Sequence, residues 1–312
     1  MKVLHVDENH PALIEGLKNL GFQNDLAYKD TLESILARID QYDGLIIRSR
    51  FPLDEAFFLN AKKLKFIGRV GAGLENIDVD AVKKHNIHLV NSPEGNRNAV
   101  GEHTLGMLLN LFNKLLPAHQ SVQSGKWERE QHRGEELSGK TIGIIGYGNM
   151  GKSFSKKLSG FDVNVLCYDI LADVGDENAQ QLTLEEIQEK CHVISLHTPE
   201  TRLTQYMIDA FFIDKMKNPF WLLNTARGSA VVSEALVDGL KTGKILGAGL
   251  DVLDYESKSF STVFKSVQLP DTLAYLIAAK NVVLSPHIAG WTVESHILLA
   301  TTIVKKIKKI YS

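Results

Sequence analysis

The chain has 312 residues, of which 44% are hydrophobic, and its formal net charge at pH 7 is −2. At about 150 residues per domain, this length predicts two globular domains with ordinary hydrophobic cores. A net charge so close to zero argues against an extended electrostatic surface for nucleic acid or for a membrane.

Cysteine content and hydropathy predict a cytoplasmic protein without metal. The two cysteines, Cys167 and Cys191, lie among apolar residues at predicted strands and are too few for a disulfide framework or a metal site. We expect buried thiols in a reducing compartment. The apolar run at the N-terminus is too short for a signal peptide, and no stretch approaches the roughly 18 apolar residues of a membrane helix.

In the first third of the chain, short apolar strands alternate with amphipathic helices, which is typical of α/β proteins. The predicted strands are Val3–Val6, Gly44–Arg48, Phe66–Val70 and Ile87–Val90, and the predicted helices are Pro11–Leu20, Thr31–Ile39, Leu53–Ala61 and Val79–His85. This succession predicts a first domain built on a parallel sheet.

A long helical pattern follows, from Asn98 to about Ser124. Its apolar residues recur at helical spacing and form one stripe: Leu105, Leu108, Leu109, Phe112 and Leu116. The pattern is longer than a typical helix. The sequence therefore allows a bridge between two domains, a subunit interface, or ordinary packing against a core.

From Thr141 a second series of strands begins. The predicted strands are Thr141–Ile145, Val163–Tyr168, Val193–His197, Trp221–Asn224, Leu246–Leu250 and Val282–Leu284, and a last helix runs from about Val293 to Ile310. We predict an α/β protein with two doubly wound parallel-sheet domains. Residues 99–291 would form a Rossmann nucleotide-binding domain, inserted into a flavodoxin-like substrate domain of residues 1–98 and 292–312.

The segment Gly146-Tyr-Gly-Asn-Met-Gly151 has the glycine spacing of dinucleotide-binding proteins. It follows one predicted strand and opens a helical pattern, and the next strand ends at Asp169. In such sites Gly146 permits the tight turn, Gly148 lets a pyrophosphate approach the backbone, and Gly151 lets helix and strand pack closely. The alternative is an ordinary strand–helix turn with a capping aspartate.

The acid at the end of the second strand predicts NAD rather than NADP. A carboxylate at Asp169 accepts a hydrogen bond from a ribose 2′-hydroxyl and repels a 2′-phosphate. The next residues, Ile170-Leu-Ala172, offer no arginine or lysine to receive that phosphate.

Three ionisable residues follow strands of the second series: Arg227, Glu256 and His287. Ligands bind at the carboxyl ends of strands in open α/β sheets. Each residue alone is more simply a surface arginine, a solvated acid or a capping histidine. Their presence beyond three strands of one sheet favours a catalytic site.

Several motifs together resemble the D-isomer-specific 2-hydroxyacid dehydrogenases, and most of all the D-3-phosphoglycerate dehydrogenases of that family. They are Gly71-Ala-Gly-Leu-Glu-Asn-Ile-Asp78, Gly146–Gly151, His197-Thr-Pro199, Asn224-Thr-Ala-Arg-Gly228, Gly249-Leu-Asp-Val252 and Ser285-Pro-His287. The resemblance extends over essentially the whole chain. It implies hydride transfer between NAD and a D-2-hydroxy acid or its 2-keto acid, in a short form without the regulatory extension through which serine would act.

The resemblance also implies a role for each matching residue. Arg227 would hold the substrate carboxylate and polarise the keto oxygen, His287 would be the acid/base, and Glu256 would orient it. The implied cofactor contacts are Gly146, Tyr147, Gly148, Asn149, Met150, Gly151, Asp169, His197, Thr198, Pro199, Thr204, Thr225, Ala226, Asp251, His287 and Gly290. The implied substrate contacts are Arg48, Arg69, Ala72, Gly73, Asn76, Arg227 and His287, with the backbone of Ala72 and Gly73 binding the carboxylate and Asn76 supporting their loop.

The chemistry of keto-acid reduction fits these roles. Negative charge grows on the carbonyl oxygen as hydride arrives, and a fixed guanidinium stabilises it better in a dry site than in water. The same oxygen needs a proton, and histidine titrates nearest neutrality. A nearby glutamate favours the charged imidazole.

Three departures from the family pattern bear on the substrate. Ser257 stands where proline often follows the glutamate, the segment from Glu256 to His287 is longer than expected and predicts an extra loop over Ser257–Phe264, and Trp291 replaces a small polar residue. A bulky indole at that position would narrow or reshape the pocket.

Arg48 and Arg69 match arginines that face the substrate phosphate in phosphoglycerate dehydrogenases. Planar guanidinium groups suit phosphate, Arg50 adds a charge close by, and Arg129 could reach in from a partner subunit. Structural pairing of Arg48 and Arg69 with acids such as Glu75 or Asp78 is the alternative.

The leading hypothesis is thus an NAD-dependent enzyme that interconverts D-3-phosphoglycerate and 3-phosphohydroxypyruvate, as in serine biosynthesis. A glyoxylate, hydroxypyruvate or other D-2-hydroxyacid reductase is the nearest alternative. An NAD(H)-sensing binding protein, like the C-terminal-binding corepressors on this scaffold, is the alternative of another class, because fold alone does not determine function. The stripe Leu105–Leu116 and Gly125-Lys-Trp127 resemble the family's subunit contact and imply a homodimer.

Overall fold

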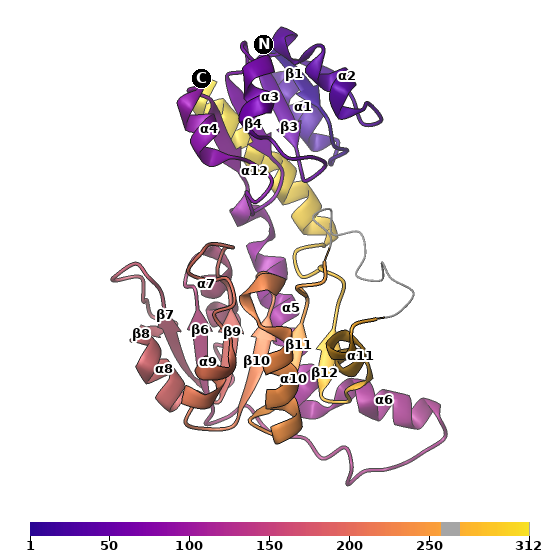
Figure 1. The fold of residues 1–312 in the computed structure, drawn as a ribbon, viewed down its shortest axis with the longest axis vertical. Coiled ribbons are helices and arrows are strands. Elements are labelled where there is room, and N and C mark those ends of the chain that lie inside the picture. The colour runs from indigo at the N-terminus through magenta and orange to yellow at the C-terminus, as the bar shows by residue number, and fades with distance from the viewer. Residues whose placement is uncertain (257–268, 312) are drawn as a thin grey trace. The chain divides into compact units, whose positions relative to one another are not determined.

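The computed structural model describes residues 1–256 and 269–311. They form two compact units, the first of Met1–Arg97 with Trp291–Ser312 and the second of Asn98–Gly290. Each unit is built on a parallel β-sheet flanked by helices (Figure 1), which confirms the predicted α/β fold class. The expected extra loop Ser257–Phe264 lies outside the described residues.

The first unit contains a five-stranded sheet in the order β2-β1-β3-β4-β5. Its strands are β1 (Lys2–His5), β2 (Gln23–Leu26), β3 (Gly44–Ile47), β4 (Phe66–Arg69) and β5 (His88–Asn91). Four of these confirm predicted strands. The prediction missed β2, because its sequence Gln-Asn-Asp-Leu has no apolar pattern. As an edge strand that pairs with β1 alone, it does not need one.

The helices of the first unit are α1 (Ala12–Asn19), α2 (Leu32–Leu36), the 3-10 turn η1 (Ile39–Gln41), α3 (Glu55–Asn60), α4 (Val79–Lys84) and α12 (Val293–Tyr311). The predicted helix Thr31–Ile39 is thus shorter, and a separate turn follows it. The C-terminal helix α12 packs on α1 through Leu299, Ile303 and Ile307. A Cβ at Gly16 of α1 would lie 2.7 Å from a methyl group of Val304, so this glycine lets the two helices approach closely.

The second unit contains a seven-stranded sheet in the order β12-β11-β10-β9-β6-β7-β8. Its strands are β6 (Thr141–Ile145), β7 (Asn164–Tyr168), β8 (Gln180–Gln181), β9 (Val193–Leu196), β10 (Phe220–Asn224), β11 (Ile245–Leu250) and β12 (Val282–Leu284). Its further helical elements are α7 (Asn149–Lys157), α8 (Leu184–Lys190), α9 (Ala210–Lys215), η2 (Gly228–Ala230), α10 (Ser233–Thr242) and α11 (Asp271–Ala278). The sheet grows to opposite sides of β6, through β7 and through β9. The carboxyl end of β6 is therefore the switch point at which such sheets bind ligands.

The predicted helix Asn98–Ser124 is two helices, and in this respect the prediction was wrong. α5 (Pro93–Asn113) begins earlier, in the first unit, and α6 (Leu115–Gln123) follows it. Between them Lys114 has a left-handed backbone with φ 51°, which ends the first helix. Lysine gives no sequence signal for such a break, because this conformation favours glycine and asparagine.

Most of the apolar stripe on α5 is ordinary core. Leu108 and Phe112 are buried in one cluster with Trp221 and Leu223 of the second sheet, while Leu116 on α6 is 40% exposed. The stripe therefore stabilises the second unit, and α6 presents separate apolar side chains to solvent.

Two properties predicted from composition can be compared with the structure. No helix among residues 1–256 and 269–311 is long and apolar enough to cross a membrane. Both thiols are buried, and burial raises the pKa of Cys167 to about 11 and that of Cys191 to about 12. These cysteines act as small core residues.

Candidate active site

The glycine loop after β6 has the shape that a pyrophosphate requires. Gly146 has φ +89°, and a Cβ there would lie 2.8 Å from the carbonyl carbon of His197. A Cβ at Gly151 would lie 2.3 Å from the carbonyl oxygen of Gly146. At Gly148, in contrast, a Cβ would meet nothing within 4 Å. The loop thus leaves open space at the N-terminus of α7, where backbone N–H groups favour a phosphate.

Asp169, at the end of β7, is tied to this loop. Its Oδ2 accepts a hydrogen bond of 2.7 Å from the backbone N–H of Tyr147, and its Oδ1 accepts one of 3.0 Å from Leu171. Each carboxylate oxygen keeps a second acceptor site for a ribose hydroxyl. Ile170 and Leu171 are 73% and 64% exposed, so apolar side chains occupy the position where a 2′-phosphate would need a cation.

The Tyr147 side chain points away from the open side of the glycine loop. It is 1% exposed, and its hydroxyl donates a hydrogen bond of 2.7 Å to Asp176 in the segment after β7. Its backbone, not its phenol, is thus available to a cofactor. Asn149 and Met150, the first residues of α7, are exposed and half-buried respectively.

The residues after β9 shape the neighbouring edge of the loop. His197 is packed against Phe154, and its Nε2 lies 2.8 Å from the Ser195 hydroxyl. Burial lowers the pKa of His197 to about 3, so its ring is neutral and structural. The Thr204 hydroxyl donates to the Pro199 carbonyl oxygen at 2.7 Å and closes the turn that follows. A cofactor would meet the backbone of this turn.

The expected acid/base pair is assembled in the second unit. His287 Nδ1 lies 2.7 Å from Glu256 Oε2, and the other oxygen of Glu256 accepts a 2.7 Å hydrogen bond from the backbone N–H of Leu253. The side chains of His287 and Glu256 are 27% and 17% exposed. Because Nδ1 faces the carboxylate, Nε2 is the ring nitrogen that can face a substrate.

Arg227 stands on the neighbouring loop, after β10. The buried Asn224 side chain shapes this loop by donating to the Arg227 carbonyl oxygen at 2.9 Å and accepting from the Ala226 N–H at 3.1 Å. A Cβ at Gly228 would lie 2.1 Å from the carbonyl carbon of Leu253. The backbone after β10 therefore packs directly on the segment that carries Glu256.

Asp251, at the end of β11, fixes the loop that carries His287. The Asp251 carboxylate is 1% exposed and accepts hydrogen bonds from the Ser285 hydroxyl at 2.6 Å and from the N–H groups of Ile288 and Ala289 at 2.8 Å. Its own carbonyl oxygen accepts the N–H of His287 at 2.8 Å. His287 adopts φ 56°, a strained conformation that these bonds help to hold.

Two side chains of α5 join the site without any signal in the sequence. His103 Nε2 lies 2.9 Å from the Ser285 hydroxyl and 3.6 Å from Asp251 Oδ1. The Thr104 hydroxyl lies 3.0 Å from that of Thr225. Their only mark in the sequence is a pair of polar residues within the apolar stripe of a helix.

In the first unit, the loop after β4 offers backbone donors. The N–H groups of Ala72 and Gly73 make no hydrogen bond within the described part of the chain, whereas the Asn91 side chain donates to the Ala72 carbonyl oxygen at 2.7 Å. Asn76 Nδ2 donates to the Phe51 carbonyl oxygen at 3.3 Å and so supports the loop. Adjacent free N–H groups suit a carboxylate.

The arginines differ in their surroundings. Arg48, just beyond β3, is half-buried, and its guanidinium makes no hydrogen bond or ion pair with another described residue, which disfavours the structural alternative for it. Arg50 donates instead to the carbonyl oxygens of Val6, Ala27 and Asp30, so the expectation that it adds a free charge was wrong. The Arg69 guanidinium covers Gly71, where a Cβ would lie 1.5 Å from Nη1. Arg129 is exposed.

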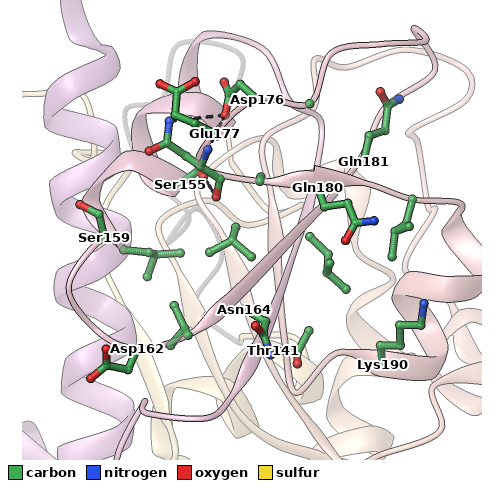
Figure 2. Close-up of a pocket in the computed structure, with 18 of the residues that line it drawn as sticks. Thr141, Ser155, Ser159, Asp162, Asn164, Asp176, Glu177, Gln180, Gln181 and Lys190 are labelled. Carbon is green, nitrogen blue, oxygen red and sulfur yellow. Dashed lines mark hydrogen bonds between the residues drawn. The ribbon is translucent and has the colours of Figure 1, made fainter.

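A wide hollow in the second unit lies apart from these residues. It has a volume of about 1100 Å³ and lies along β7, β8 and α7, lined by polar side chains that include Ser155, Ser159, Asp162 and Asn164 (Figure 2). None of the residues that we expect to bind cofactor or substrate lines it.

Comparison with known proteins identifies the family. The family model "D-isomer specific 2-hydroxyacid dehydrogenase, NAD binding domain" matches residues 105–289. The chain is 32% identical to a hydroxypyruvate reductase of Thermotoga maritima over 97% of this chain and 95% of that protein. The chain belongs to the D-isomer-specific 2-hydroxyacid dehydrogenase family. This family membership confirms the expected resemblance, and NAD as the cofactor of residues 105–289.

Other members of the family differ in length and name. A D-3-phosphoglycerate dehydrogenase of Archaeoglobus fulgidus is 33% identical over 98% of this chain, which spans 56% of that protein. The solved D-lactate dehydrogenase of Aquifex aeolicus, in complex with NAD and lactic acid, has a TM-score of 0.83 and 27% identity, covering 100% of this chain and 95% of the other. The chain thus spans little more than half of that phosphoglycerate dehydrogenase, but nearly all of the reductase.

We predict that Asp169→Ala narrows the preference for NAD, chiefly by weakening NADH binding. The lost charge-assisted hydrogen bonds correspond to about 1.5–3 kcal/mol, or roughly 10- to 100-fold in the dissociation constant. Titration of NADH and NADPH fluorescence measures both affinities. Asp169→Asn is the matched control, because it keeps an acceptor for the Tyr147 N–H and loses only the charge that repels a 2′-phosphate. Equal affinities of the unmodified protein for NADH and NADPH would contradict the assignment.

Proposed function

We propose that the protein is an NAD-dependent D-2-hydroxyacid dehydrogenase whose substrate carries a second anionic group, with D-3-phosphoglycerate and 3-phosphohydroxypyruvate as the expected pair. The observation that carries the reaction type is the 2.7 Å contact between His287 Nδ1 and Glu256 Oε2, beside the loop of Arg227. In this proposal the second unit holds NAD and the acid/base, and the first is the substrate domain. A cytoplasmic enzyme of serine biosynthesis would fit this assignment.

The proposed roles follow from the charges that keto-acid reduction creates. Bound NADH supplies the hydride that adds to the carbonyl carbon. As the carbonyl π electrons move to oxygen, His287 Nε2 gives that oxygen a proton, and Glu256 stabilises the imidazolium before the transfer. Arg227 binds the substrate carboxylate and stabilises the charge that develops on the oxygen. In the oxidative direction the same histidine removes the hydroxyl proton.

Support for an anionic substrate comes from the first unit. The free N–H groups of Ala72 and Gly73 fit a carboxylate, and we assign them to the carboxylate of the substrate. The half-buried Arg48 guanidinium makes no hydrogen bond or ion pair with another described residue. Such a group is expected to bind an anion, and its planar fork suits phosphate. We assign Arg48 and Arg69 to the distal phosphate.

A small-acid reductase is the second candidate. The chain spans 95% of a hydroxypyruvate reductase, and the indole of Trp291 occupies a position where the family more often has a small residue. An NAD(H)-sensing binding protein remains the alternative of another class, since the catalytic residues alone do not distinguish it. Turnover with a panel of 2-keto acids separates the three.

We further propose that the protein is a homodimer. Exposed apolar side chains gather on α6 and just after it: Leu115, Leu116, Val122 and Trp127, with exposures of 56%, 40%, 53% and 79%. An apolar patch of this kind is typical of an interface. Light scattering at micromolar concentration should give twice the 34.7 kDa of one chain, and a monomeric mass would contradict the proposal.

We predict that His287→Ala lowers kcat by about 100- to 10,000-fold, the usual contribution of a positioned acid/base, while the NADH dissociation constant changes little. Glu256→Gln should move the pH optimum of keto-acid reduction downward, because a neutral amide favours the imidazolium less. Steady-state pH profiles and NADH fluorescence measure these effects. An unchanged pH profile in Glu256→Gln would remove the assignment of this pair.

We predict that 3-phosphohydroxypyruvate is reduced with a higher kcat/KM than pyruvate or glyoxylate, and that Arg48→Ala raises its KM by roughly 10- to 100-fold, as the loss of a charge-assisted contact of about 1.5–3 kcal/mol implies. Arg133→Ala is the control, because Arg133 is exposed and pairs with Glu130. If the phosphorylated acid is turned over no better than the small acids, and its KM is unchanged in Arg48→Ala, the small-acid reductase is the better assignment.

A further inference from the structure

Three basic groups and an indole gather at the carboxyl edge of the sheet in the first unit. Arg48 follows β3 and His10 follows β1, while Trp291 and His296 lie before and within α12. The Arg48 Cζ lies 4.4 Å from the centroid of the Trp291 ring. The rings of His10 and His296 meet edge to face, with centroids 5.3 Å apart at an interplanar angle of 87°.

The surroundings of Arg48 leave its donors available. Its backbone N–H, and not its side chain, donates to Asp7 Oδ2 at 2.5 Å. Burial lowers the pKa of Arg48, and the charge of Asp7 opposes this. The indole of Trp291 covers one face of the guanidinium. A stacked guanidinium keeps its in-plane N–H groups free for an anion, so Trp291 fixes the plane in which those groups point.

The two histidines add charge that depends on pH. His10 Nδ1 accepts the backbone N–H of Ala12 at 3.2 Å, while His10 Nε2 and both ring nitrogens of His296 have no hydrogen bond to any described residue. Burial, and then the charges of His10 and Arg48, lower the pKa of His296, whereas Glu8 raises it. Three cations that repel one another in this way are stabilised when an anion binds among them.

We propose that Trp291 positions Arg48, and that Arg48, His10 and His296 form one subsite for the distal anionic group of the substrate, a phosphate or a second carboxylate. The identity of that substrate rests on the proposed function, whereas the binding of an anion does not. Because protonation of the two histidines adds positive charge, the subsite binds more tightly as pH falls from 8 to 5.5. Keto acids with a single carboxylate have no group to place there.

The first experiment measures anion binding without turnover. Sulfate, which stays a dianion between pH 5.5 and 8, is titrated into the full chain by calorimetry, with ionic strength held constant by sodium chloride. Binding should be about tenfold tighter at pH 5.5, which corresponds to about 1.4 kcal/mol. The double variant His10→Gln/His296→Gln should lose this pH dependence, and Arg48→Ala should lose most of the binding. Sulfate binding that is unchanged in Arg48→Ala and equal at both pH values would overturn the subsite.

The second experiment tests the positioning role of Trp291 and the class of anion. Trp291→Leu should raise KM about fivefold, a loss in the usual range for a cation–π contact, for 3-phosphohydroxypyruvate if the anion is a phosphate or for 2-oxoglutarate if it is a carboxylate. The effect should fall on KM and not on kcat, and Trp291→Phe should restore most of it. A similar change in KM for pyruvate and glyoxylate would show a merely structural role and overturn the proposal.

The two experiments also separate this inference from the proposed function. If neither dianionic keto acid is reduced while sulfate binds with the predicted pH dependence, the subsite stands and the proposed substrate falls. If the phosphorylated acid is reduced but Trp291→Leu raises its KM no more than Trp291→Phe does, the reaction stands and the positioning role of Trp291 is wrong.

Discussion

The buried carboxylate of Asp251 is the constraint on which the second unit's candidate site depends. A buried charge is costly unless hydrogen bonds satisfy it, and here the donors are the Ser285 hydroxyl and the N–H groups of Ile288 and Ala289. All three belong to the loop that carries His287. The charge of one residue at the end of β11 therefore sets the backbone of the proposed acid/base at the end of β12.

Parallel strands turn this local constraint into a site. Arg227, Glu256 and His287 follow the neighbouring strands β10, β11 and β12, whose carboxyl ends lie at one edge of the sheet. Glycines then bring the connecting segments together, since a side chain at Gly228 would collide with the backbone of Leu253. The glycine loop for NAD follows β6 at the same edge. Cofactor, guanidinium and imidazole are thus placed by one sheet, and the loops between strands supply the chemistry.

The sequence predicted what depends on local pattern and missed what depends on tertiary contacts. Central strands were predicted because both faces are buried and their sequences are continuously apolar, whereas the polar edge strands β2 and β8 carry no such signal. The glycine fingerprint indicated its loop because each glycine answers a steric need that the structure shows. His103, by contrast, reaches Ser285 from a distant helix, and the carbonyl groups that bind Arg50 come from three separate segments. The contact between Trp291 and Arg48 also joins distant parts of the chain.

The role of Asp251 is tested most directly by the rate of hydride transfer in a single turnover of Asp251→Asn, followed by NADH absorbance in a stopped-flow instrument. Asparagine keeps the size of the side chain but replaces one acceptor by an NH₂ group that faces N–H donors. The loop of His287 should then shift, and a displacement of about 1 Å is enough to slow the transfer by roughly 100-fold, while NADH still binds. Hydride transfer at the rate of the unmodified protein would contradict the claim that this carboxylate positions the acid/base.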